Sequence, residues 1–296
     1  MNTIQLVGVL EFGLIYGLVA IGVYLSLRVL DFPDLSVDGT FPLGAATYAA
    51  LVVVGVHPLL ATLCAIVLGG VAGLVTAWLS THLKFMNLLS GILVMTALYS
   101  INLKIMRRPN ISLLGENTIF EEFFLPLKTY LGSFWRVLPI LMLIGLLAYA
   151  LNRFLKTNIG LALRATGNNA RMARAQGIND KAMVSLGLCI ANSFVALGGA
   201  IFAQINGFAD ITIGVGTIII GLAAVIIGEA IFPVKRISYV ILACIGGAIL
   251  YRFVIATALN IGGSFLQGSD LNLVTAILVG IAMLLPDLKK QLGLKS

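Results

Sequence analysis

The chain has 296 residues, of which 59% are hydrophobic and only 10% are charged, and its mean hydropathy is +1.05. Soluble domains carry roughly 25% charged residues, so this composition excludes a soluble fold and predicts a polytopic membrane protein. The formal net charge of +7 does not indicate nucleic-acid binding, because the basic residues lie in loops between apolar segments.

The apolar segments predict an all-α membrane protein in which residues 1–296 form a single transmembrane domain. A helix needs about 20 apolar residues to cross a bilayer, and we expect about nine membrane segments, within a range of eight to ten. Several of them are short. The segments are residues 4–27, 41–56, 59–79, 88–105, 131–155, 182–205, 217–232, 239–259 and 271–285.

A polar stretch, DFPDLSVDGT, interrupts the chain after the first segment. Pro33 prevents a simple continuation of the helix, and Pro42 suits the first turn of the next one. Because the segment 41–56 is too short to cross comfortably, we expect a broken or re-entrant element, which needs protein or water around it.

The side chains of this first break have two interpretations. Asp31, Asp34 and Asp38 could bind the amine of a substrate, or they could cap helix ends, and capping is the favoured interpretation. Asp34, Ser36 and Asp38 are nevertheless candidate residues of a translocation path, because broken helices often line one.

A second break, residues 207–216, follows the sixth segment and contains the path candidates Asp210 and Gly214. In the predicted topology the two breaks face opposite sides of the membrane. Four segments, a linking fifth and four more would then form an inverted repeat, which often places the path at the repeat interface. Chance similarity between two glycine-containing breaks is the alternative.

Orientation follows from the basic residues. If the central loop, residues 156–181, is cytoplasmic, thirteen Lys and Arg residues lie inside and five lie outside. This distribution agrees with the positive-inside rule. We therefore expect the N-terminus outside and the C-terminus inside.

The central loop contains the sequence GLALRATGNNARMARAQGIN. Gly167, Asn168 and Asn169 predict a turn that caps a short helix over residues 170–176. Gly177 is placed to end this helix in the left-handed conformation, and Asn179 to cap the next one. Such a short helix is stable only if it packs against something, so the loop is either a partner surface or a basic segment that merely sets topology.

The spaced pattern of Gly160, Arg164, Ala165, Gly167, Asn168, Ala173, Gly177, Ile178 and Asn179 resembles the cytoplasmic loop of ABC importer permeases of the branched-chain amino acid and ribose type. In that family the short helix couples the permease to an ATPase subunit. The resemblance implies that the coupling residues are Gly167, Asn168, Asn169, Arg171, Met172, Ala173, Arg174 and Gly177.

The first break, DFPDLSVDGTFPLGAATYA, resembles the subgroup linked to uptake of aromatic amino acids such as tryptophan and tyrosine. The resemblance implies a location in the bacterial inner membrane, with membrane lipid around the chain. Its implied partners are ABC ATPase subunits, an extracytoplasmic solute-binding protein, and a second permease in a homodimer or heterodimer. The cargo would be an amino acid.

Catalytic chemistry is not indicated. The chain has no G-x-x-x-x-G-K-[ST] and no H-E-x-x-H motif, so we expect no cofactor or metal here and place ATP and Mg²⁺ on the partner ATPase. Cys64, Cys189 and Cys244 lie in apolar runs and predict inert thiols.

Three charged residues fall within apolar segments, where charge is costly. Glu11 and Arg252 lie at matched predicted depth, which suggests an ion pair near the outer mouth. The alternative is that Arg252 extends outward and Glu11 meets water. Glu229 lies near the end of its segment, and the favoured interpretation is an interfacial ion pair with Lys235 or Arg236.

Two other classes of protein remain open on the sequence alone. An ion-coupled secondary transporter also uses inverted repeats and broken helices, but it normally has ionisable groups near the bilayer midplane. A structural or assembly protein has little need for two broken segments.

Overall fold

The computed structural model describes residues 3–232 and 237–261, together with residues 277 and 280. In this part of the chain the fold is helical apart from two three-residue strands. The long helices are α1 (Thr3–Val23) with its π-helical continuation η1 (Tyr24–Val29), α2 (Val37–Val53), α3 (Pro58–Thr81), α4 (Asn87–Met106), α7 (Val137–Phe154), α10 (Asp180–Asn206), α11 (Thr217–Ile231) and α12 (Ile237–Ile261).

Shorter elements occupy the connections between the long helices. These elements lie between α4 and α7, in the central loop and at the second break. Each of them has between three and eleven residues. They are β1 (Asn110–Ser112), α5 (Ile119–Phe124), α6 (Leu127–Leu131), η2 (Gly132–Arg136), α8 (Asn158–Asn168), α9 (Ala170–Ala175), β2 (Phe208–Asp210) and η3 (Ile211–Gly214).

Seven helical segments of the described chain are long and apolar enough to span a membrane, and the protein is a multi-pass membrane protein. The predicted number of about nine segments is not confirmed. The predicted segment 41–56 is a 17-residue helix, α2, which begins four residues earlier at Val37. Pro42 therefore lies inside this helix rather than in its first turn. The predicted segment 271–285 lies outside the described residues.

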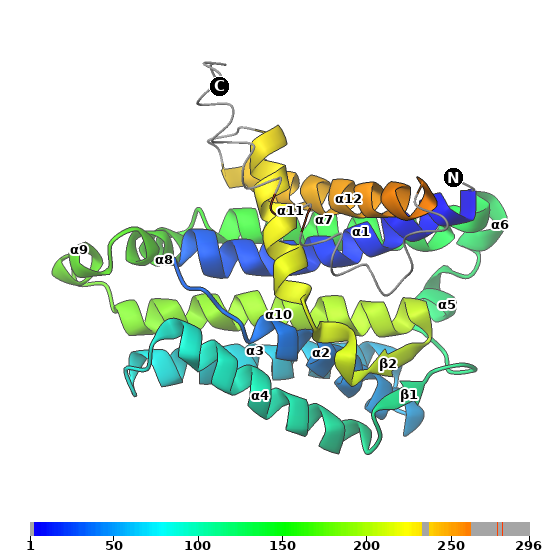
Figure 1. Ribbon diagram of the computed structural model, residues 1–296, viewed down its shortest axis with the longest axis horizontal. Helices are drawn as coiled ribbons and strands as arrows, with labels where there is room; N and C mark the ends of the chain where they lie inside the picture. Colours follow the sequence, from blue (N-terminus) through cyan, green and yellow to red (C-terminus); the bar gives the residue numbers. More distant parts are fainter. Residues whose placement is uncertain (1–2, 233–236, 262–276, 278–279, 281–296) are drawn as a thin grey trace.

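The long helices form two layers (Figure 1). Helices α1, α7 and α12 lie in one layer and α2, α3, α4 and α10 in the other, while α11 crosses steeply between them. Helices α1 and α10 run in opposite directions and contact each other. Every residue from Gly13 to Val23 is buried, because α1 is apolar on all sides and neighbouring helices surround it.

Small residues bring α10 close to its neighbours. A Cβ atom on Gly44 of α2 would lie 1.9 Å from the carbonyl oxygen of Ala196, and one on Gly199 would lie 1.9 Å from that of Phe41. Gly73 of α3 approaches the carbonyl of Leu188 in the same way. These contacts are the close backbone packing that small residues permit between membrane helices.

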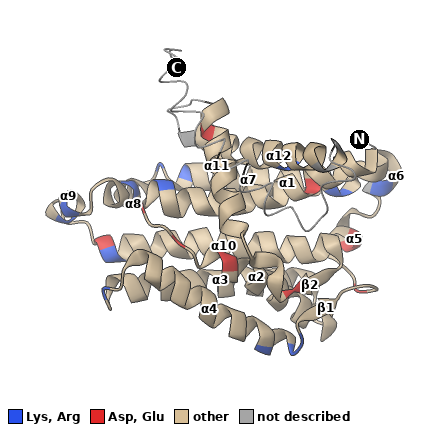
Figure 2. Cartoon of the chain, in the orientation of Figure 1, with Lys and Arg blue, Asp and Glu red and all other residues tan. Residues whose placement is uncertain are grey.

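The two ends of the bundle differ. Helices α8 and α9 lie at one end, where Lys and Arg residues gather, and the N-terminus, α5, α6 and the two strands lie at the other (Figure 2). At this second end β1 pairs antiparallel with β2, with Asn110 opposite Asp210. Which side of a membrane each end faces stays a prediction.

Candidate functional site

The first break lies between η1 and α2 and is held by buried side chains. Asp34 is 1% exposed and Ser36 is 0% exposed. The Ser36 backbone N–H and hydroxyl both donate to Asp34 Oδ1, over 2.9 and 2.6 Å. Asp34 therefore closes the turn that precedes α2 and holds Ser36, the N-cap residue of α2, but it does not cap the helix itself.

Asn192, in the middle of α10, completes this buried network. Its Nδ2 donates to Asp34 Oδ2 over 2.7 Å, and its Oδ1 accepts from the Thr40 hydroxyl over 2.8 Å. The side chains of Asn192 and Thr40 are fully buried. A carboxylate at this position would be costly without such donors. Sequence reasoning missed Asn192, although an amide in the middle of an apolar helix was a usable signal.

Asp38 of α2 stabilises the second break by accepting hydrogen bonds from it. Its carboxylate accepts from the backbone N–H groups of Gly216 and Ile218, over 3.1 and 2.7 Å. These N–H groups belong to the first turn of α11, so Asp38 caps a helix of the other half of the chain.

Gly214 lies against the same turn of α2. A Cβ atom on it would lie 2.0 Å from the Asp38 carbonyl oxygen and 2.5 Å from the Pro42 ring. Since Pro42 has no N–H to donate to that carbonyl, the Asp38 carbonyl lacks its usual intrahelical hydrogen bond where η3 approaches it. The structure thus brings Asp38 and Gly214 together.

Asp210 lies apart from this contact, at the β1–β2 pair. Its Oδ1 accepts from the Thr212 backbone N–H over 2.7 Å, and its Oδ2 accepts from Asn110 Nδ2 over 3.2 Å. Partial burial raises the pKa of Asp210, but the hydrogen bonds from Thr212 and Asn110 together hold it below its usual value. The structure gives Asp210 a capping role, and its role in a path stays a prediction.

The central loop forms α8 and α9, which meet at Asn169. Asn169 Oδ1 accepts from the Met172 N–H over 3.0 Å, which caps α9 as predicted. Gly177 has a φ of 79°, and Asn179 Oδ1 accepts from the Ala182 N–H over 3.2 Å. The local prediction is confirmed on both sides of α9.

The predicted turn at residues 167–169 is wrong in extent. Gly167 and Asn168 belong to α8, and only Asn169 is extended. Gly167 remains helical because it packs on the end of the first span, where an added Cβ would lie 1.9 Å from the Val29 carbonyl oxygen. The α8 helix therefore rests directly on η1, just before the first break.

The side chains of α9 divide into buried and exposed groups. Ala173 is 2% exposed, whereas Met172 is 62% exposed. Arg171 and Arg174 are also exposed, and Arg174 forms an ion pair with Asp180. Ala173 consequently packs within this chain. A partner that binds α9 would therefore contact the exposed residues beside it, Met172 and Arg171, rather than Ala173 itself.

Two intramembrane charges have partners that the sequence did not predict. Arg28 Nη2 lies 2.5 Å from Glu229 Oε2, whereas Lys235 and Arg236 lie outside the described residues. None of the ion pairs among the described residues joins Glu11 to Arg252. Arg252 instead lies over the Tyr16 ring, 4.3 Å from its centroid.

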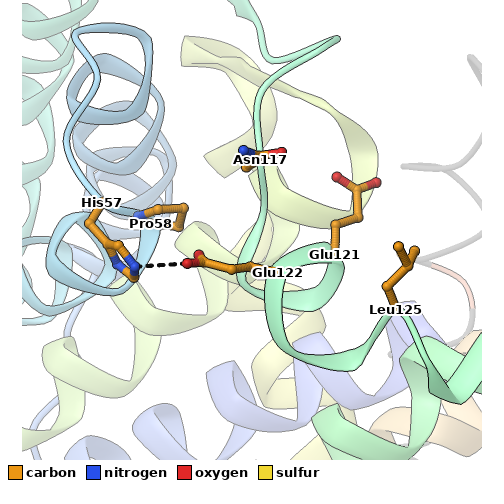
Figure 3. A pocket seen from close by; sticks show the side chains of 6 residues that line it. All are labelled: His57, Pro58, Asn117, Glu121, Glu122 and Leu125. Atoms are coloured by element: carbon orange, nitrogen blue, oxygen red, sulfur yellow. Dashed lines mark hydrogen bonds and ion pairs between the residues drawn. The ribbon is translucent and has the colours of Figure 1, made fainter.

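A pocket of about 500 Å³ with several polar side chains opens at the end of the bundle opposite α9. In it His57, at the N-cap of α3, contacts Glu122 of α5 over 3.0 Å, and Glu121 lies beside them (Figure 3). This contact joins α3 to the segment between α4 and α7. Within the described chain, no group of three His, Cys, Asp or Glu residues could hold a metal ion.

The described chain thus combines apolar helices, two breaks that contact each other's halves, and a basic helical loop at one end. The chain belongs to the family described as the permease component of the branched-chain amino acid transport system, which matches residues 5–285. It is therefore an amino acid transport permease of the ABC transporter class.

Two relatives align along nearly the whole chain. The tyrosine transport system permease protein of Clostridioides difficile (strain R20291) is 38% identical over 276 residues, covering 93% of this chain and 88% of that protein. An uncharacterised protein of Rickettsia prowazekii (strain Madrid E) is 35% identical over 282 residues, covering 94% and 96% of the two chains. No solved structure matches.

Proposed function

We propose that this chain forms the translocation path of an ABC importer for an aromatic amino acid, with tyrosine as the first candidate. The tyrosine transport system permease that aligns with 93% of this chain supports the choice of cargo. An extracytoplasmic solute-binding protein delivers the amino acid, and a second permease completes the path. The ATPase subunits bind ATP and Mg²⁺, and the importer lies in the bacterial inner membrane.

The observation that carries this proposal is the position of α8 and α9. The two helices project at one end of the bundle (Figure 1) and carry the exposed residues Arg164, Arg171 and Met172. Through Gly167 the same unit touches the carbonyl of Val29. A partner that moves α9 would therefore act on the end of the first span.

The mechanism needs no covalent chemistry in this chain. Closure of the ATPase subunits moves α8 and α9, and α8 transmits the movement to η1 and the first break. Because Asn192 and Asp38 each join one half of the chain to the break of the other half, a change at one break reaches the second. The path then alternates between its outward-open and inward-open states.

Met172 offers the sharpest test, because its side chain is exposed and Ala173 is not. In cells that co-express the cognate ATPase, Met172→Glu places an unpaired charge in the proposed interface, so we expect co-purified ATPase to fall about tenfold or more. The matched control is Met86→Glu, an exposed methionine before α4 at the same end of the bundle. Equal ATPase recovery with both variants, or none with the natural chain, contradicts the proposal.

A further inference from the structure

A cavity of about 400 Å³ lies between α1 and α12, away from both breaks. The two helices lie side by side near the N-terminus of the chain (Figure 1). The volume is within the range of about 300–1,000 Å³ that is usual for small-molecule sites. The cavity is lined by Gln5, Gly8, Val9, Phe12, Arg252, Ile255, Ala256 and Asn260.

Among the described residues that line this cavity, Arg252 is the one that carries a charge. Its guanidinium lies 4.3 Å from the ring centroid of Tyr16 and 5.1 Å from that of Phe12. Both distances are within the range of about 6 Å that is usual for cation–π contacts. Among the described residues, the buried Nε atom has no hydrogen-bond partner, and no ion pair includes Arg252.

A guanidinium in a membrane span that has no carboxylate partner among the described residues is costly and is characteristic of a functional site. A ligand that supplies a carboxylate would remove this cost, because carboxylate oxygens accept hydrogen bonds from the guanidinium edge in a strong charge-assisted geometry. The other walls of the cavity are mainly apolar, with Val9 and Ile255 on opposite helices. The cavity therefore suits a molecule that joins one carboxylate to an apolar body.

Gly8 lines open space in the cavity, and two amide side chains lie beside it. A Cβ atom on Gly8 would meet no atom within 4 Å, so this wall is open space rather than packed helix. Gln5 Nε2 donates to Asn260 Oδ1 over 3.4 Å, which places two amides next to the apolar wall. Amides of this kind are suited to the polar groups of a small ligand.

We propose that this cavity binds the α-carboxylate of the transported amino acid through Arg252, with the apolar side chain of the amino acid against α1 and α12. This assignment rests on the proposed function, because an aromatic amino acid combines a carboxylate with an apolar ring. The site would receive the amino acid at the end of the bundle opposite α9, before the amino acid reaches the two breaks.

The test measures binding of radiolabelled L-tyrosine to the purified permease–ATPase complex in nanodiscs without the solute-binding protein. Arg252→Gln should weaken binding about tenfold or more, since it removes a charge-assisted hydrogen bond. Arg252→Lys, which keeps the charge, should lose less. Binding that is absent from the natural complex, or unchanged by Arg252→Gln, overturns the proposal.

A second variant keeps the test valid if Arg252→Gln fails to fold. Gly8→Leu places a side chain at the cavity wall, where an added Cβ meets no atom within 4 Å, and should also weaken binding. Gly145→Leu on α7 is its matched control, because Gly145 is exposed and likewise has no atom within 4 Å of an added Cβ. Equal binding by the two leucine variants overturns the proposal.

Competing ligands identify the group that Arg252 binds. 3-(4-Hydroxyphenyl)propionate keeps the carboxylate and should compete with L-tyrosine, whereas tyramine lacks it and should not. Competition by oleate alone would assign the site to lipid and overturn the proposal. Tyrosine uptake by the natural complex with its solute-binding protein is measured separately, so absent uptake contradicts the proposed function and normal uptake without Arg252-dependent binding contradicts only this inference.

Discussion

The two breaks of this permease are stabilised in different ways. The first is closed by a fully buried side-chain network, in which Asn192 of α10 holds Asp34 and Thr40. The second is closed by one partly buried carboxylate, since Asp38 caps backbone N–H groups of α11. In each case the stabilising residue comes from the other half of the chain. The comparison indicates that the first break is rigid and expensive to open, and that the second is the easier one to release.

Replacing Asn192 should have the largest effect on stability. Asn192→Ala leaves the buried Asp34 Oδ2 without its donor, which should cost about 3 kcal/mol of folding free energy. The Thr40 hydroxyl can still donate to the Ser36 carbonyl. Thermal unfolding of the purified protein in detergent measures the change. Asn206→Ala is the control, because Asn206 is on the same helix and its Nδ2 donates only to a carbonyl of that helix, Phe202 O. A loss no greater than that of the control would show that the first break does not depend on this network.

Replacing Asp38 should have a smaller effect. Asp38→Ala removes the acceptor for two N–H groups of α11, and the loss of a helix cap costs about 1–2 kcal/mol. Asp38→Asn keeps an oxygen acceptor and should recover most of the stability, since Asn is also a good N-cap residue. If the asparagine variant is as unstable as the alanine variant, the charge and not the cap is what matters at the second break.

The smallest effect concerns the pH dependence of the second break. The pKa of Asp210 lies below its ordinary value of 3.8 in the folded protein. Its stabilising contribution is therefore fully present above pH 3.8 and is lost as the pH falls through the lower, folded-state pKa. The difference in unfolding temperature between the natural chain and Asp210→Asn should be constant near neutral pH and shrink in this acidic range. A constant difference throughout would contradict the assignment.

The sequence predicted the local structure of the central loop correctly where the contacts are short in sequence. Asn169 caps α9 through a residue three positions away, and Gly177 supplies a left-handed φ that other residues rarely adopt. It also predicted the helical membrane class, because the composition alone requires it. The extent of the turn was wrong at Gly167, whose helical position depends on contact with Val29, more than a hundred residues earlier.

Only the tertiary structure decided which side chains of distant segments pair with each other. Asn192 with Asp34, Arg28 with Glu229, and Arg252 with the rings of Phe12 and Tyr16 all join parts of the chain that are far apart. An apolar helix packed on several sides has no polar face to indicate which way each residue points. Its rotation is set by packing against its neighbours, so the sequence by itself determined which residues are costly in a membrane, and the fold determined which partner each of them has.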